Sequence, residues 1–194
     1  MAAASALAAA LVVVGCEDLG LPGGGTVATA DLVVLPLQTG APPVTPQSFY
    51  VYNGRPVTRQ LTHSDAALNA YLRIEFPPGC LSSLNGTPLS IDDSVFVTVE
   101  SRAGGYGLTL SPSGLEFTLE TPTVTFFYGR YADPSVADAE PSFADVAAYL
   151  AALEVWEEAT VGRWRVARAS GPAGVDAIAA ALDAPGELLI AAAR

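Results

Sequence analysis

The only histidine of the chain, His63, is followed directly by Ser64 and Asp65, so the three residue types of a serine hydrolase stand side by side. Members of a catalytic triad meet in space from separate elements, and three direct neighbours have the wrong geometry for that chemistry. The sequence also has no G-x-S-x-G segment, which would place a nucleophilic serine on a sharp turn. We therefore predict a polar loop between strands here, with a hydrolase around His63 as an alternative.

Carboxylates gather in the segment from Tyr131 to Asp145. Hard oxygen ligands presented by a loop are what calcium requires. Their spacing is not that of an EF-hand, and no glycine stands where the sharp turn would need one. The segment predicts a solvated acidic loop. The alternative is a calcium site with the candidate ligands Asp133, Asp138, Glu140 and Asp145.

The chain has two cysteines, Cys16 and Cys80, which together with His63 cannot supply the common four-ligand zinc sets. We predict no cofactor and no other metal. Cys80 is expected to be a small buried thiol. The alternatives are a disulfide between molecules, or one with Cys16 if that residue is unmodified. Asn85-Gly86 predicts a hairpin turn, although Asn85-Gly86-Thr87 also fits a glycosylation sequon.

The first sixteen residues differ in kind from the rest of the chain. Ala2 to Val14 is a run of 13 residues that is apolar apart from Ser5, and no charged residue precedes Glu17. A bilayer span needs about 20 residues, so the run is too short to cross a membrane. Its length fits the apolar region of an export signal.

The end of this run, Val13-Val14-Gly15-Cys16, resembles a bacterial lipobox, in which the cysteine becomes the first mature residue and carries a lipid. The resemblance implies a signal peptide over 1–15 and a lipid on Cys16, with the protein exported and anchored to the membrane of the bacterial cell envelope. The chain departs from a usual signal because no Lys or Arg precedes the apolar run. The alternative is a buried helix of alanine and valine with an ordinary core cysteine.

Composition limits the remaining possibilities. The 194 residues are 51% apolar, which is enough for one hydrophobic core. Nine scattered arginines against twenty carboxylates give a net charge of −11, which excludes a nucleic-acid surface. Proline and glycine are dense over 16–46, which predicts a lipidated N-terminus and a flexible tether, within which Asp31 to Leu37 could pair as an edge strand. We expect one domain over 47–194.

Short runs of alternating apolar and polar residues fill this domain, separated by turn residues. About seven to nine strands predict an all-β fold, an antiparallel β-sandwich of two sheets packed face to face. The expected strands include Tyr71–Phe76, Val95–Val99, Leu115–Leu119, Val124–Phe126, Leu153–Glu157, Trp164–Ala167 and Leu188–Ala192. One short helix is expected over Ser142–Leu150 with Ser142 as its cap. Ala177–Ala181 fits a helix or a strand.

Two segments, Phe76–Ile91 and Leu108–Phe117, resemble the ZU-five domain of ankyrins and netrin receptors. The second follows the family pattern Leu-Ser-Pro-x-Gly-x-x-Phe. The residues that carry the resemblance are Pro77, Pro78, Gly79, Ser111, Pro112, Gly114 and Phe117. The resemblance implies a β-sandwich that binds protein partners without cofactor or catalysis, and Cys80 departs from it where the family has alanine.

The same residues have a direct physical meaning. Neither Pro77 nor Pro78 can donate to a β-ladder, so the run Pro77-Pro78-Gly79 ends a strand. Pro112 fixes φ and Gly114 can adopt a positive φ, so this segment predicts a tight reversal between two strands.

Aromatic residues on the second faces of the expected strands are the main indication of binding. Five aromatic residues stand opposite the expected core residues of their strands: Tyr50, Tyr52, Tyr71, Phe96 and Phe127. Three interpretations are open: one face of the sheet binds a partner, both faces are covered, or some strands have inside and outside reversed. We predict a non-enzymatic, lipid-anchored interaction or structural module whose partner is an envelope protein or a glycan. The alternative is a carbohydrate- or calcium-binding sandwich that uses Trp156 and Trp164.

Overall fold

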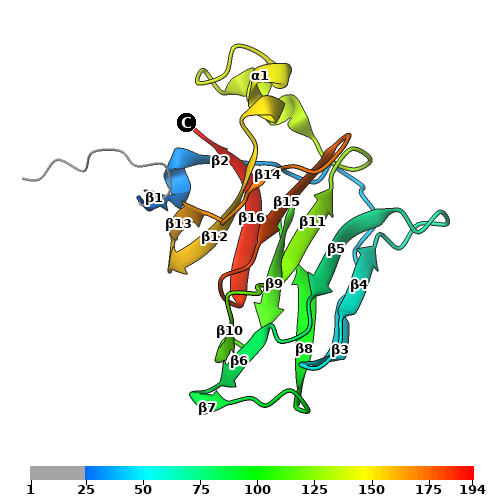
Figure 1. Cartoon of the computed structure of the whole chain (residues 1–194). Helices are drawn as coiled ribbons and strands as arrows, with labels where there is room; N and C mark the ends of the chain where they lie inside the picture. Colours follow the sequence, from blue (N-terminus) through cyan, green and yellow to red (C-terminus); the bar gives the residue numbers. More distant parts are fainter. Residues whose placement is uncertain (1–24) are drawn as a thin grey trace, which may run out of the picture.

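The computed structural model describes residues 25–194. Cys16 and the predicted signal peptide lie outside the described residues. Three antiparallel sheets make up the described part (Figure 1). The largest has eight strands, in the order β1 (Val27–Ala28), β13 (Arg163–Val166), β12 (Glu154–Thr160), β16 (Gly186–Ala193), β9 (Gly107–Ser111), β8 (Ser94–Ser101) and β3 (Gln47–Tyr52), with β2 (Leu32–Val34) also paired to β16.

The other two sheets are smaller. One has five strands, in the order β14 (Gly171–Pro172), β15 (Ala177–Ala181), β11 (Thr123–Phe127), β5 (Ala70–Phe76) and β4 (Val57–Thr62). The other has three strands, β10 (Leu115–Phe117), β6 (Leu81–Leu84) and β7 (Thr87–Pro88). The run Ala177–Ala181, which fitted a helix or a strand, is therefore a strand.

The main core lies between the eight-stranded and five-stranded sheets, which confirms the predicted antiparallel β-sandwich. Alternate side chains of each strand point into it, as the period of two requires. The larger sheet contributes Val95, Val97, Val99, Leu108, Leu110, Val155, Leu188 and Ile190, and the smaller one Leu61, Leu72, Ile74, Phe76, Val124, Phe126, Ile178 and Ala180.

Tyr71 does not lie on an outer face, as its place in the alternation predicted, but is fully buried. In the β4–β5 pairing, Leu61 faces Leu72 while Thr62 faces Ala70, so Tyr71 is the extra residue of a β-bulge. A bulge turns two consecutive side chains toward the same side of the sheet. The hydroxyl of Tyr71 consequently reaches the opposing sheet, where it donates to the Gly107 carbonyl (2.6 Å) and accepts from the Gly107 N–H (2.9 Å).

The predicted tether is wrong for residues 27–46, because this stretch is built into the fold. β2 pairs with β16, and the main chain of Leu35 bonds to Ile190 (2.9 Å) and Tyr106 (2.8 Å). Leu32, Val33 and Leu35 are buried. The apolar run for which an edge strand is the alternative therefore forms a strand despite the surrounding prolines, and the first strand of the described residues begins at Val27.

This N-terminal segment covers a second, smaller apolar cluster on the outer face of the eight-stranded sheet. The cluster consists of Leu32, Trp156, Trp164, Leu189 and Ala191, with Val27, Val34 and Val166 packed against it. Its members alternate along β12 and β16 with the residues of the main core, so this end of the sheet is covered on both faces.

The single α-helix of residues 25–194, α1 (Val146–Ala151), lies at the top of Figure 1. It falls within the predicted range, but its cap is Asp145 rather than Ser142, since the Asp145 carboxylate accepts from the Ala148 N–H (2.7 Å). Two short 3-10 helices complete the fold, η1 (Thr29–Asp31) and η2 (Pro134–Ala139).

The strand end predicted at Pro77-Pro78-Gly79 and the hairpin turn predicted at Asn85-Gly86 are both confirmed. β5 ends at Phe76, directly before the two prolines, and Gly79 adopts φ 75°. Asn85 and Gly86, with φ 50° and 77°, close the β6–β7 hairpin. A positive φ at both central residues is the requirement of a type I′ turn.

The turn at Ser111–Gly114 differs from its prediction. It carries the chain from β9 to β10, and these strands pair with different partners, so it links two sheets rather than closing a hairpin. Gly114 does not adopt a positive φ; instead, its lack of a side chain leaves room for the Asn85 amide, which a Cβ at this position would displace. β10 also ends at Phe117, and Leu119, expected on the face of Leu115 and Phe117, is exposed.

Candidate functional site

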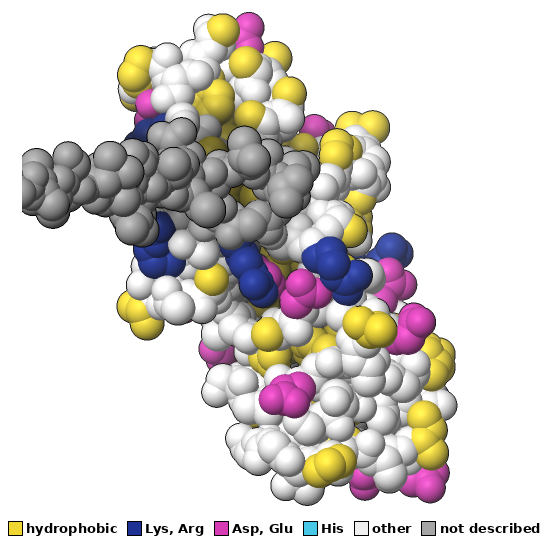
Figure 2. Space-filling model, turned by 60° about the vertical axis from the view of Figure 1, so that its left-hand side comes forward, with side chains coloured by type: hydrophobic (Ala, Val, Ile, Leu, Met, Phe, Trp, Pro, Cys, Tyr) yellow, Lys and Arg dark blue, Asp and Glu magenta, His cyan; other side chains and the backbone are white. Residues whose placement is uncertain are grey.

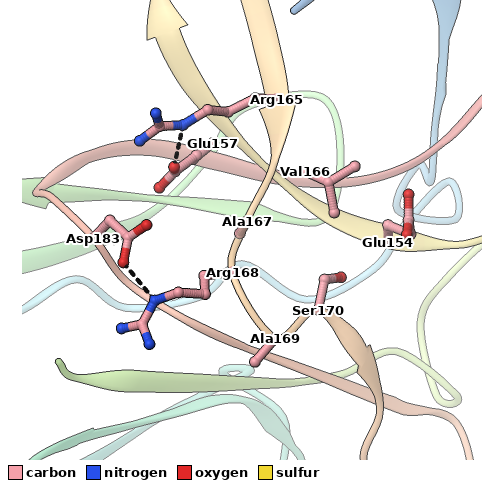
Figure 3. A pocket seen from close by; sticks show the side chains of 9 residues that line it. All are labelled: Glu154, Glu157, Arg165, Val166, Ala167, Arg168, Ala169, Ser170 and Asp183. Atoms are coloured by element: carbon pink, nitrogen blue, oxygen red, sulfur yellow. Dashed lines mark hydrogen bonds and ion pairs between the residues drawn. The ribbon is translucent and has the colours of Figure 1, made fainter. Parts of the chain in front are cut away.

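A hollow with a volume of about 660 Å³ lies beside β12 and β13 (Figure 3). Two ion pairs line it. The Arg165 Nε lies 2.5 Å from a Glu157 carboxylate oxygen, and the Arg168 Nε lies 2.9 Å from an Asp183 oxygen. Glu154 lines the other end of the hollow (Figure 3).

Two carboxyl groups of this hollow, those of Glu154 and Glu157, are partly withdrawn from water, whereas Asp183 is exposed. Burial raises the pKa of Glu157, and the Arg165 guanidinium only partly offsets this. Burial also raises the pKa of Glu154. The one hydroxyl of the lining, on Ser170, accepts a hydrogen bond from the Val155 N–H (2.7 Å). The hollow is therefore a polar recess that contains two ion pairs.

None of the residues lining this hollow was predicted as a site. Its charged residues come from two neighbouring strands and from the loops that follow β13 and β15. Charges brought together in this way leave no spacing pattern in the sequence, so no signal could have identified them.

The four candidate calcium ligands each have another partner or stand apart. Asp133 caps η2 by accepting from Ser135 (3.2 Å from N, 2.6 Å from Oγ), and Asp145 caps α1. Glu140 pairs with Arg194 (2.7 Å), whose guanidinium lowers the pKa of that carboxyl. Asp138 is exposed. Across residues 25–194, no three His, Cys, Asp or Glu side chains gather closely enough to hold a metal ion.

His63 is fully buried rather than part of a polar loop, and it lines none of the hollows described for the surface. Its Nδ1 lies 2.9 Å from the Pro42 carbonyl, so Nδ1 carries the proton. The Ser64 hydroxyl donates to the Pro43 carbonyl (2.9 Å) instead of to the imidazole. Asp65 accepts from the Tyr131 hydroxyl (2.5 Å), a bond that lowers its pKa well below the usual range.

The imidazole of His63 is packed by aromatic rings. The Tyr131 ring centroid lies 4.4 Å from that of His63, and the Tyr71 ring lies 5.4 Å away, edge-on. The three neighbours that suggested a hydrolase thus have separate structural contacts, and the hydrolase alternative gains no support from their geometry.

Cys80 is buried and free, as predicted for a small core thiol. Burial raises the pKa of the Cys80 thiol to about 11, so it stays protonated and unreactive at neutral pH. Because the sulfur is inaccessible, a disulfide to another molecule would require the fold to open.

Neither tryptophan can stack on a sugar ring. Trp156 and Trp164 are 4% and 1% exposed. Their indole N–H groups donate to the Ala191 carbonyl (3.0 Å) and the Thr29 hydroxyl (2.8 Å). Both rings belong to the cluster beneath the N-terminal segment, so the carbohydrate-binding alternative cannot use them as we had predicted.

Three aromatic side chains do form an exposed group, which we call the aromatic face: Tyr50, Tyr52 and Phe96. Tyr50 on β3 stands directly opposite Phe96 on β8, with ring centroids 5.0 Å apart, and both are 53% exposed. The Tyr52 ring lies 6.4 Å from Tyr50, and the Arg55 guanidinium sits 3.8 Å from the Tyr52 centroid. The prediction of outward-facing aromatics is confirmed for these three, whereas Phe127 is half-buried.

No protein-family model matches the chain, and no curated protein matches it. Among residues 25–194, no helix has the length and apolar character needed to cross a bilayer.

Proposed function

We propose that this chain is a lipid-anchored protein of the bacterial cell envelope whose β-sandwich binds another envelope protein. The observation that carries the proposal is the aromatic face. Single exposed apolar residues are normal on soluble proteins, whereas adjoining large rings on one sheet face are typical of an interaction surface.

The composition of the aromatic face supports a protein as the partner. Tyrosine, phenylalanine and arginine are enriched in protein interfaces. Tyr50 and Phe96 form a cross-strand pair, and Arg55 stacks on Tyr52, so these side chains lose little freedom when a partner binds. β3 is also the end strand of its sheet, which leaves main-chain groups at this edge for a partner.

The lipobox at Val13–Cys16 supports the anchor, and the likeness of two segments to the ZU-five domain supports protein binding without catalysis. The order of the eight-stranded sheet fits both roles. β1, which follows the predicted anchor, and β3, which carries Tyr50, stand at the two ends of a seven-strand path. Six spacings of about 4.8 Å separate them by about 29 Å. The aromatic face would thus stand clear of the anchored edge.

Intact-mass measurement of the protein from bacterial membranes tests the anchor. The expected product begins at Cys16 and carries acyl chains, and Cys16→Ser abolishes both changes. A product that keeps Met1 and lacks acyl chains would overturn the anchor.

Site-specific photo-crosslinking in cells tests the aromatic face. A photoreactive amino acid at Phe96 is expected to yield a discrete protease-sensitive adduct. Val175 is the matched control, since it is 92% exposed and lies beside β15 in the other sheet. A glycosidase-sensitive adduct would identify a glycan instead. Equal adducts from both positions, or none from Phe96, would refute the aromatic face as the binding surface.

A further inference from the structure

We infer that the edge of the sandwich formed by β1 and the β12–β13 turn rests on the surface of the anchoring membrane, with Val161 in contact with the lipid. This inference rests on the proposed lipid at Cys16. It adds which surface of the protein the membrane touches and which chemistry that surface offers.

The length of chain between the anchor and the fold keeps this edge near the membrane. Val27 opens β1, and Cys16 precedes it by 11 residues. At about 3.4 Å per residue the fully extended connection spans at most about 37 Å. A folded domain of this size is about 40 Å across. The connection is thus no longer than the domain itself, and the edge that carries β1 is the part held closest to the lipid.

The β12–β13 turn adjoins β1. The Gly162 carbonyl accepts from the Thr29 N–H (3.2 Å) and from the Thr29 hydroxyl (3.3 Å). Next to Gly162 in this turn, Val161 is 96% exposed. The preceding residues, Ala159 and Thr160, are also exposed and uncharged. The tip of the β12–β13 turn is therefore a small uncharged projection, with Val161 as its apolar side chain, beside β1, the strand that follows the proposed anchor.

One charged group of this edge, the guanidinium of Arg163, suits contact with a phospholipid phosphate. The guanidinium of Arg163 is exposed and donates to the Thr26 carbonyl (2.6 Å) and hydroxyl, without a carboxylate partner among residues 25–194. Its remaining N–H groups can reach a phosphate. The two carboxylates of the edge, Asp31 and Glu158, accept from the main-chain N–H of Ala28 (3.2 Å) and Gly162 (2.8 Å).

Arginine side chains are visible on this side of the molecule. Figure 2, which brings the β1 side forward, shows dark blue side chains in a band across it, with magenta carboxylates among them. Arg194 reaches the Ala30 carbonyl and pairs with Glu140, and Arg102 lies 5.6 Å from the Trp164 ring centroid and pairs with Glu187 (3.1 Å). In contrast, the β7–β8 loop, β10 and the segment after β10 carry the exposed carboxylates Asp92, Asp93, Glu116 and Glu120, none of which forms an ion pair with an arginine of residues 25–194. In a protein of net charge −11, this distribution turns the acidic end away from an anionic surface.

The cysteine content of the chain provides a direct test. Cys80 is buried, and Cys16 is occupied in the lipidated protein, so a cysteine introduced by Val161→Cys can be labelled selectively with a polarity-sensitive fluorophore. Val175→Cys, at an equally exposed turn of the other sheet, is the matched control. Both full-length lipidated proteins are reconstituted into vesicles of phosphatidylcholine and phosphatidylglycerol that contain a lipid-borne quencher.

We expect several-fold stronger quenching and bluer emission at position 161 than at position 175. Arg163→Gln is expected to reduce the quenching only when phosphatidylglycerol is present, whereas Arg59→Gln, the same charge change on β4, leaves it unaltered. Flotation with the vesicles separates the two possible failures. Protein that does not float overturns the anchor itself, whereas protein that floats with equal quenching at both positions overturns only the membrane contact.

Discussion

Replacing Tyr71 by phenylalanine removes a single oxygen atom from the centre of the sandwich, where that oxygen joins the two sheets. The Tyr71 hydroxyl donates to the Gly107 carbonyl and accepts from the Gly107 N–H. In the Tyr71→Phe variant the carbonyl still accepts from the Arg102 N–H (3.0 Å). The Gly107 N–H is left buried without a partner, and the space vacated by one oxygen is too small to admit a water molecule.

The expected cost follows from these two losses. A lost hydrogen bond costs about 0.5–1.5 kcal/mol, and an orphaned buried N–H costs about 1–3 kcal/mol, so the free energy of unfolding should fall by about 2–4 kcal/mol. With an m value of about 2 kcal/mol/M, the urea midpoint should fall by about 1–2 M.

Urea unfolding of a soluble form that begins at Glu17, followed by the fluorescence of the buried tryptophans, measures this change. Tyr50→Phe is the matched control, since the same oxygen is removed from an exposed ring, and its effect should stay within about 0.5 kcal/mol. If both variants unfold at the same midpoint, the hydroxyl of Tyr71 does not join the two sheets and the reasoning is refuted.

Three further predictions concern individual side chains. Cys80 should not react with a thiol reagent at pH 8 until urea is added. Because burial raises the pKa of the folded thiol to about 11, its contribution to the free energy of unfolding should be lost as pH rises from about 9 to 11. The Cys80→Ala variant should not show this loss. Asn53→Ala should cost about 3 kcal/mol in urea unfolding, because the buried amide bonds the Leu81 N–H (2.9 Å) and carbonyl (3.0 Å); an unchanged midpoint would contradict that role. Asp145→Ala should cost about 1 kcal/mol as the loss of a helix cap, and millimolar calcium should shift the Tm of neither form; a calcium-dependent rise that the variant lacks would instead support a metal site.

Local patterns were sufficient to predict the sandwich. The alternation around Val95–Val99 specifies a strand with one buried face, and Asn85-Gly86 specifies a hairpin turn, because both effects arise within a few residues. The aromatic pair Tyr50 and Phe96 could be placed outward for the same reason. The sequence does not indicate that Tyr50 and Phe96 stand directly opposite each other, because strand pairing joins distant parts of the chain.

The errors arose where distant contacts overrule local pattern. Tyr71 points inward because of a bulge, and a bulge depends on register with a neighbouring strand. The segment at Leu32–Val34 was interpreted as part of a tether because of its proline-rich surroundings, but it pairs with residues 191–193 at the other end of the chain. The hollow near Arg165 was missed since its lining is assembled only by the fold.

The position of β16 has a consequence for how the protein is made. This strand follows all the other described strands in the sequence, yet it stands in the middle of the eight-stranded sheet and pairs with β2, β9 and β12 (Figure 1). Until β16 has left the ribosome, the two halves of that sheet have no common strand, so the sheet cannot complete its folding as the chain emerges. Removal of residues 186–194 would take away the strand that joins the two halves of the sheet.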